Sequence, residues 1–98
     1  MNFYYYHFAL FSESCEMKAA KFDYYCKGNP LDREGNKVGS WKACSDLCFN
    51  EKLCAKWRYS GRDYKCFMYS ECDFMKSSTH YRKWKYVAGE KTCSGSDG

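Results

Sequence analysis

The sequence lacks several features that mark membrane-spanning, disordered and redox-active proteins. No apolar run approaches the 18 residues of a transmembrane candidate, so direct membrane insertion is not expected. The 98 residues contain one proline, and aromatic residues make up 20% of the chain, whereas disordered chains are poor in aromatics. The Cys-x-x-Cys motif of thioredoxin-like sites is also missing. A folded chain of 98 residues is expected to form a single domain.

Recognisable catalytic residues are missing as well. The two histidines, His7 and His80, lie among aromatic or basic residues, and no Ser, Asp or Glu near them completes a catalytic signature. An enzyme needs a nucleophile or an acid–base pair in a cleft. We therefore expect no enzymatic activity and no cofactor. The net charge of +4 does not by itself indicate nucleic-acid binding, and none is expected.

Eight cysteines are the most informative residues that are present. Eight is an even number, and about 8% of the chain is the lower edge of the range for disulfide scaffolds. A structural zinc site would combine Cys44 and Cys48 with Cys66 and Cys72, or with His80, but it would leave the other cysteines without a role. Disulfides use all eight. They predict an oxidising compartment, so that the protein is secreted, extracellular or at the cell surface, with no bound metal.

Residue periodicity predicts an α+β fold. Ser40 is a candidate N-cap, and the residues behind it place Trp41, Cys44 and Cys48 on one face of a short helix, about residues 41–50. Alternating residues and turn signals predict the other elements: strands at 54–60 and 64–70 joined by a turn, further strands at 21–26 and 80–87, and loops at 27–39 and 71–79.

The segment KACSDLCFNEKLCAKWRYSGRDYKCFMYS, residues 42–70, resembles the PAN/apple domain superfamily. It has Cys-x3-Cys on a helix, a cysteine that opens the next strand, and a cysteine on the following hairpin strand. The resemblance spans residues 15–93, preceded by an aromatic N-terminal arm or edge strand at 1–14 and followed by a flexible tail at 94–98. It implies one short helix packed on an antiparallel sheet. It also implies a non-enzymatic recognition or adhesion module that binds a protein or a carbohydrate.

The resemblance also implies a disulfide pairing. Its common pattern joins Cys44 to Cys66 and Cys48 to Cys54, and apple domains join their first and last cysteines. Carried onto this chain, the four implied pairs are Cys44–Cys66, Cys48–Cys54, Cys15–Cys93 and, as the remainder, Cys26–Cys72. The alternative exchanges partners in the last two pairs, giving Cys26–Cys93 and Cys15–Cys72.

A basic surface is the first candidate binding site. Strand alternation places Lys56 and Arg58 opposite Trp57 and Tyr59, and therefore toward solvent. The candidate ligand-binding residues are Lys56, Arg58, Arg62, Lys65 and Arg82. Together they would suit an anionic, sulfated glycan or an acidic protein. The alternative is that these charges provide solubility and discourage edge-to-edge strand pairing.

The aromatic N-terminus is the second candidate. Its candidate docking residues are Phe3, Tyr4, Tyr5, Tyr6 and Phe8, which serve either as core or as an arm that docks into a larger assembly. The stretch lacks a basic residue ahead of its apolar part and a clear cleavage site, so we do not interpret it as an intact signal peptide. The alternative functions are a structural subunit of an extracellular assembly, a part of a multidomain chain, or a small secreted antagonist.

Overall fold

The computed structural model describes residues 14–77 and 86–94. Within them the chain forms one helix and eight strands, in the order β1 (Ser14–Met17), β2 (Lys21–Phe22), β3 (Tyr24–Lys27), β4 (Asn36–Lys37), α2 (Trp41–Asn50), β5 (Lys56–Ser60), β6 (Lys65–Tyr69), β7 (Asp73–Lys76) and β8 (Tyr86–Ser94). The expectation of an α+β, disulfide-rich domain with one short helix and an antiparallel sheet is confirmed for these residues.

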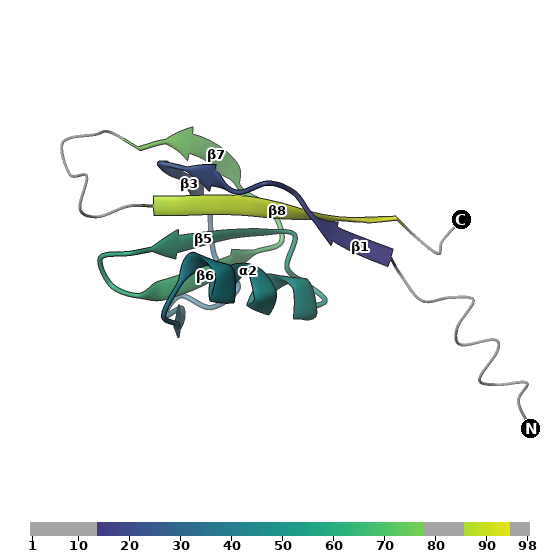
Figure 1. Ribbon diagram of the computed structural model, residues 1–98, viewed down its shortest axis with the longest axis horizontal. Helices are drawn as coiled ribbons and strands as arrows, with labels where there is room; N and C mark the ends of the chain where they lie inside the picture. The colour runs from purple at the N-terminus through teal and green to yellow at the C-terminus, as the bar shows by residue number, and fades with distance from the viewer. Residues whose placement is uncertain (1–13, 78–85, 95–98) are drawn as a thin grey trace, which may run out of the picture.

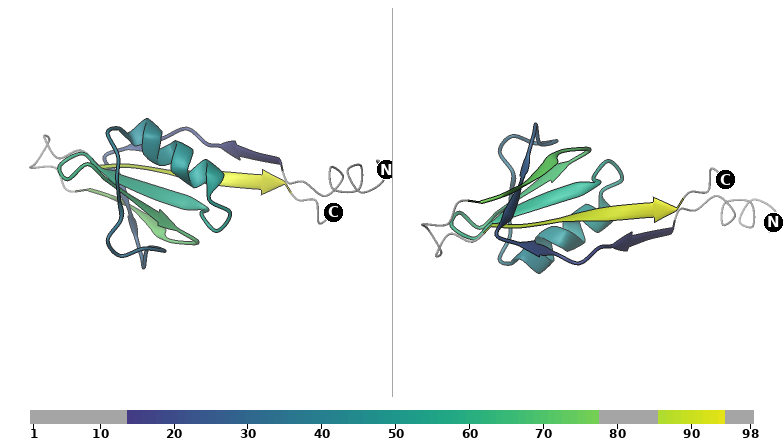
Figure 2. Two further views of the ribbon diagram at one scale, coloured as in Figure 1. Left: turned by 90° about the horizontal axis from the view of Figure 1, so that it is seen from below. Right: turned by 90° about the horizontal axis from the view of Figure 1, so that it is seen from above.

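The described strands form two antiparallel sheets. The main sheet has the order β1-β8-β5-β6-β4, and β2 also pairs with β8. β3 and β7 form a separate two-stranded ribbon. Figures 1 and 2 show α2 on one side of β5 and β8, with β3 and β7 on the other side. The domain therefore has three layers: helix, main sheet and ribbon.

The helix has the predicted bounds, and its first turn is capped as expected. Ser40 has extended backbone geometry, and its Oγ accepts a hydrogen bond from the backbone N–H of Ala43 at 3.1 Å. Cys44 and Cys48 lie one turn apart on the face that packs on the sheet, and both are fully buried. A ten-residue helix is marginal alone, so its packing and its two disulfides hold it in place.

A tryptophan stack forms the centre of the helix-side core. Trp57 of β5 is 1% exposed, and its ring stacks on that of Trp41 at 6.2 Å between centroids. Gly89 of β8 lies directly against the Trp57 ring. A Cβ at that position would come within 2.5 Å of a Trp57 ring carbon, so the close approach requires glycine.

All eight cysteines are paired in the structure. Cys44–Cys66 joins α2 to β6, and Cys48–Cys54 joins α2 to the segment before β5. Cys15–Cys93 joins β1 to β8, and Cys26–Cys72 joins β3 to the residue that precedes β7. The pairing agrees with the one that the resemblance implies, and differs from both the exchanged alternative and the zinc interpretation.

Several strand predictions need correction. The predicted strand at 21–26 is broken at Asp23, whose φ of 69° ends β2 and starts β3 in a new direction. The predicted loop at 27–39 contains the short β4, and the loop at 71–79 contains β7. The strand predicted at 80–87 begins, within the described residues, at Tyr86 and continues to Ser94, which was assigned to the tail. Residues 1–13, 78–85 and 95–98 of these predictions lie outside the described residues.

Candidate functional site

The alternation along β5 was predicted correctly, but the solvent exposure of its basic face was not. Lys56 and Arg58 lie opposite Trp57 as expected. The ribbon covers that face, however. The Lys56 ammonium donates a hydrogen bond to the carbonyl oxygen of Cys72 at 3.1 Å and lies 5.0 Å from the ring centroid of Phe74 in β7. The prediction that both side chains point freely to solvent is therefore wrong.

Arg58 is the more enclosed of the two cations. Its guanidinium lies 4.4 Å from the ring centroid of Phe67 and 5.6 Å from that of Tyr86. The Arg58 Nε is buried, with no hydrogen-bond partner among the described residues. Burial raises the pKa of the neighbouring Tyr69 hydroxyl, and the positive charge of Arg58 opposes that rise. Arg58 is therefore held between two aromatic side chains of the main sheet, Phe67 of β6 and Tyr86 of β8.

Among the remaining predicted basic residues, Lys65 does not join Lys56 in one patch. Lys65 lies opposite Ser60, at the turn end of the hairpin, while Lys56 is at the other end of β5. Four residues of strand separate the two ends by roughly 13 Å. Arg62 is exposed in the connecting turn. Arg82, like the aromatic docking residues Phe3, Tyr4, Tyr5, Tyr6 and Phe8, lies outside the described residues.

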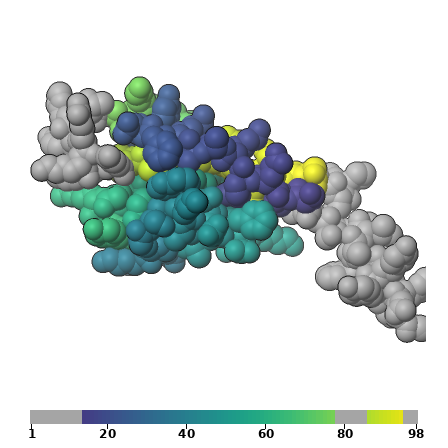
Figure 3. Space-filling view, viewed as in Figure 1, coloured from purple at the N-terminus to yellow at the C-terminus, as the bar shows by residue number. Residues whose placement is uncertain are grey.

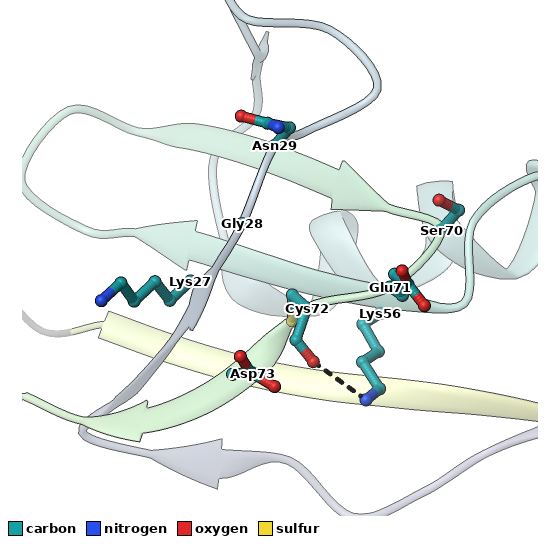
Figure 4. Close-up of a pocket in the computed structure, with 8 residues that line it drawn as sticks. All are labelled: Lys27, Gly28, Asn29, Lys56, Ser70, Glu71, Cys72 and Asp73. Carbon is teal, nitrogen blue, oxygen red and sulfur yellow. Dashed lines mark hydrogen bonds between the residues drawn. The ribbon is translucent and has the colours of Figure 1, made fainter.

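An open depression lies where the ribbon meets the beginning of β5, and we call it the ribbon depression (Figure 4). Its volume is about 620 Å³. Three chain segments form its lining: the end of β3 and the residues after it, the start of β5, and the residues before and at the start of β7. The lining residues are Lys27, Gly28, Asn29, Lys56, Ser70, Glu71, Cys72 and Asp73. The Cys26–Cys72 disulfide brings the first and third segments together.

The wall of the ribbon depression is held in place by backbone pairing and by one lysine. Lys27 and Asp73 are directly opposite each other in the β3–β7 ladder. Figure 4 shows the Lys56 side chain reaching toward Cys72, where its ammonium binds the carbonyl. The ring of Phe74 beside this ammonium restricts its position further. One donor of the site is thus fixed before any ligand arrives.

The chemistry of the ribbon depression is polar and balanced in charge. The lining includes two lysines and two carboxylates, together with the Asn29 amide and the Ser70 hydroxyl. Such a mixture can both donate to and accept from a ligand that carries many hydroxyl groups. The lining has no excess of positive charge that would attract a polyanion.

Sequence reasoning identified only Lys56 among these polar residues. The others fall into two groups that are more than forty positions apart in the sequence, so they form no local motif. The first group is Lys27 and Asn29, and the second is Ser70, Glu71 and Asp73. The usable signal was the implied Cys26–Cys72 pair, because residues that flank two bonded cysteines must lie near each other.

No family model matches the chain, and neither a curated protein nor a solved structure does so. The PAN/apple assignment therefore stays a prediction that rests on the cysteine pattern. In the described part of the chain, no helix is long and apolar enough to cross a membrane.

Proposed function

We propose that this chain is a non-enzymatic, extracellular recognition domain that binds a carbohydrate in the ribbon depression. The observation that carries the proposal is the balanced set of donors and acceptors around that depression, with Lys56 already fixed by Cys72 and Phe74. Four disulfides in a domain of this size support an oxidising, extracellular location.

Charge balance favours a neutral glycan over a sulfated one. The expectation of an anionic ligand depended on several exposed cations on one surface, and Arg58 is instead packed between aromatic rings. Near the depression the charge of Lys56 and Lys27 is offset by Glu71 and Asp73. A polysulfated chain would meet two carboxylates there, so like-charge repulsion would oppose its binding.

Screening the oxidised protein against neutral and sulfated oligosaccharides, followed by titration of ¹⁵N-labelled protein by NMR, tests the proposal. We expect neutral oligosaccharides to shift the amide signals of residues 27–29 and 70–73. Asp73→Asn should weaken binding at least about tenfold, because a charged acceptor contributes on the order of 1.5–3 kcal/mol. Asp46→Asn, an exposed change on α2, is the matched control and should bind as wild type does.

Three outcomes would contradict the proposal. Preference for sulfated oligosaccharides would show that charge, and not hydroxyl recognition, governs binding. Signals that move only outside the ribbon depression would place the site elsewhere. Failure of every oligosaccharide to bind would leave protein recognition as the remaining form of the recognition hypothesis.

A further inference from the structure

β1 and the last part of β8 form a two-stranded extension of the main sheet. β8 pairs with β5 only through residues 86–90, whereas it pairs with β1 through residues 91–94. Figure 1 shows β1 and this end of β8 extending past the other strands. Cys15 and Cys93 are directly opposite each other in this ladder and are joined by a disulfide.

This disulfide is the most exposed of the four. Cys93 is exposed and Cys15 is half-buried. By contrast, Cys44, Cys48 and Cys66 are 0% exposed, and their bonds lie inside the helix-side core. The Cys26–Cys72 bond is intermediate, because Cys26 is 2% exposed and Cys72 is half-buried. Attack on a disulfide requires access to a sulfur atom, so exposure ranks Cys15–Cys93 first.

The surface around the bond leaves room for an attacking group. An open hollow of about 280 Å³ borders the two cysteines, and its other lining residues are Ser14, Glu16, Thr92 and Ser94. Most of these side chains are small, and none is aromatic or basic. Among the described residues, a cysteine-containing loop of a dithiol protein therefore meets little steric obstruction at the Cys15–Cys93 bond.

We infer that Cys15–Cys93 is a thiol-exchange site that takes a dithiol reductant, while the other three disulfides are structural. A thiolate of the reductant attacks the Cys93 Sγ, the Cys15–Cys93 bond breaks, and its electron pair leaves on the Cys15 thiolate. The second thiolate of the reductant then attacks the reductant's first sulfur, which is bonded to the Cys93 Sγ in the mixed disulfide. That bond breaks, and Cys93 leaves as a thiolate. The protein disulfide gains two electrons and two protons, and the dithiol becomes a disulfide.

Reduction frees β1 and uncovers one edge of β8. Apart from the disulfide, β1 is held by its ladder to residues 91–94, by Met17, which packs against the core, and by hydrogen bonds at its two ends: the Ser94 Oγ donates to the Ser14 carbonyl, and the Lys18 N–H to the Glu90 carbonyl. The helix, hairpin and ribbon keep their own disulfides. Loss of β1 exposes unpaired backbone groups along residues 91–94, and such an edge can pair with an extended segment of another chain.

Partial reduction followed by trapping tests the exchange site on the wild-type protein. Samples are treated with limiting dithiothreitol, quenched with N-ethylmaleimide over time and mapped by mass spectrometry. We expect the first modified species to carry two labels, on Cys15 and Cys93, at a rate at least about tenfold above that of any other pair. First labelling of Cys26 and Cys72, or appearance of all eight labels together, would overturn the inference.

Hydrogen exchange tests the release of β1 on the two-label species and on the Cys15→Ser/Cys93→Ser variant. We expect faster exchange at residues 14–17 and 91–94, with unchanged protection in β5 and β6. Retained protection in β1 would show that the bond does not control the strand. Loss of protection throughout would show that the bond is a structural staple. Glycan titration of the oxidised protein is independent of both results.

Discussion

Lys91 of β8 is a buried cation that completes the C-terminal end of α2. It is 8% exposed, and its ammonium donates hydrogen bonds to the carbonyl oxygens of Cys48 and Glu51, each at 2.8 Å. The helix has no basic residue in its own last turn. Because carbonyls at a helix C-terminus are unsatisfied and carry partial negative charge, a cation from β8 supplies what the helix lacks.

Replacing Lys91 with Met removes the charge while keeping a side chain of similar length. Each charge-assisted hydrogen bond contributes about 1.5–3 kcal/mol. The loss leaves the Glu51 carbonyl without this donor, whereas the Cys48 carbonyl keeps the backbone N–H of Glu51 at 3.2 Å. Two effects reduce the total: the ammonium no longer has to be desolvated, and methionine recovers part of the apolar packing. We expect the free energy of unfolding to fall by about 2–3 kcal/mol.

Guanidinium unfolding with the disulfides intact measures this loss, from the denaturation midpoint at unchanged slope. Lys52→Met is the matched control, because Lys52 is exposed beyond the same end of the helix. The control should change stability by less than about 0.5 kcal/mol. The reasoning is refuted if Lys91→Met also falls within about 0.5 kcal/mol of wild type, since the hydrogen bonds would then add nothing beyond their desolvation cost.

Local patterns account for the parts of the fold that were predictable. The helix was found with its correct bounds because Ser40, the apolar face and the cysteines all lie within one short window. The central hairpin was predictable because its two alternating strands and the turn between them also lie within one short window. Lys91 was not recognisable, because its partners are 40–43 residues away and a lysine between Glu90 and Thr92 has the pattern of an exposed strand residue.

The ribbon explains the main error at the candidate site. Alternation indicates which residues share a face of a strand, but it does not indicate whether another layer covers that face. β7 has the sequence DFMK, with charged residues at both ends and one half-buried side chain, Phe74, so its strand signal is weak. Without β7 in the prediction, Lys56 has no covering layer and is expected in solvent. Arg58 is enclosed instead by rings of the two strands beside β5, which alternation does not indicate.

Three further predictions concern stability. Gly89→Ala should lower the free energy of unfolding by about 1–3 kcal/mol, because the added Cβ overpacks against the buried tryptophan of β5. Gly39→Ala, with no heavy atom within 4 Å of the added Cβ, should change it by less than about 0.5 kcal/mol. Equal midpoints of the two variants in chemical unfolding would contradict the packing. Ser40→Ala should cost about 1 kcal/mol in the same assay through loss of the N-cap, and an unchanged midpoint would show that the cap bond is not significant. Arg58→Glu should lower the free energy of unfolding by about 2–4 kcal/mol, because a carboxylate replaces a cation between two rings and is desolvated without a partner. Arg33→Glu makes the same charge change at an exposed position and should be nearly neutral. Equal, small losses in the two arginine variants would mean that the Arg58 side chain is not enclosed between the rings of Phe67 and Tyr86 in solution.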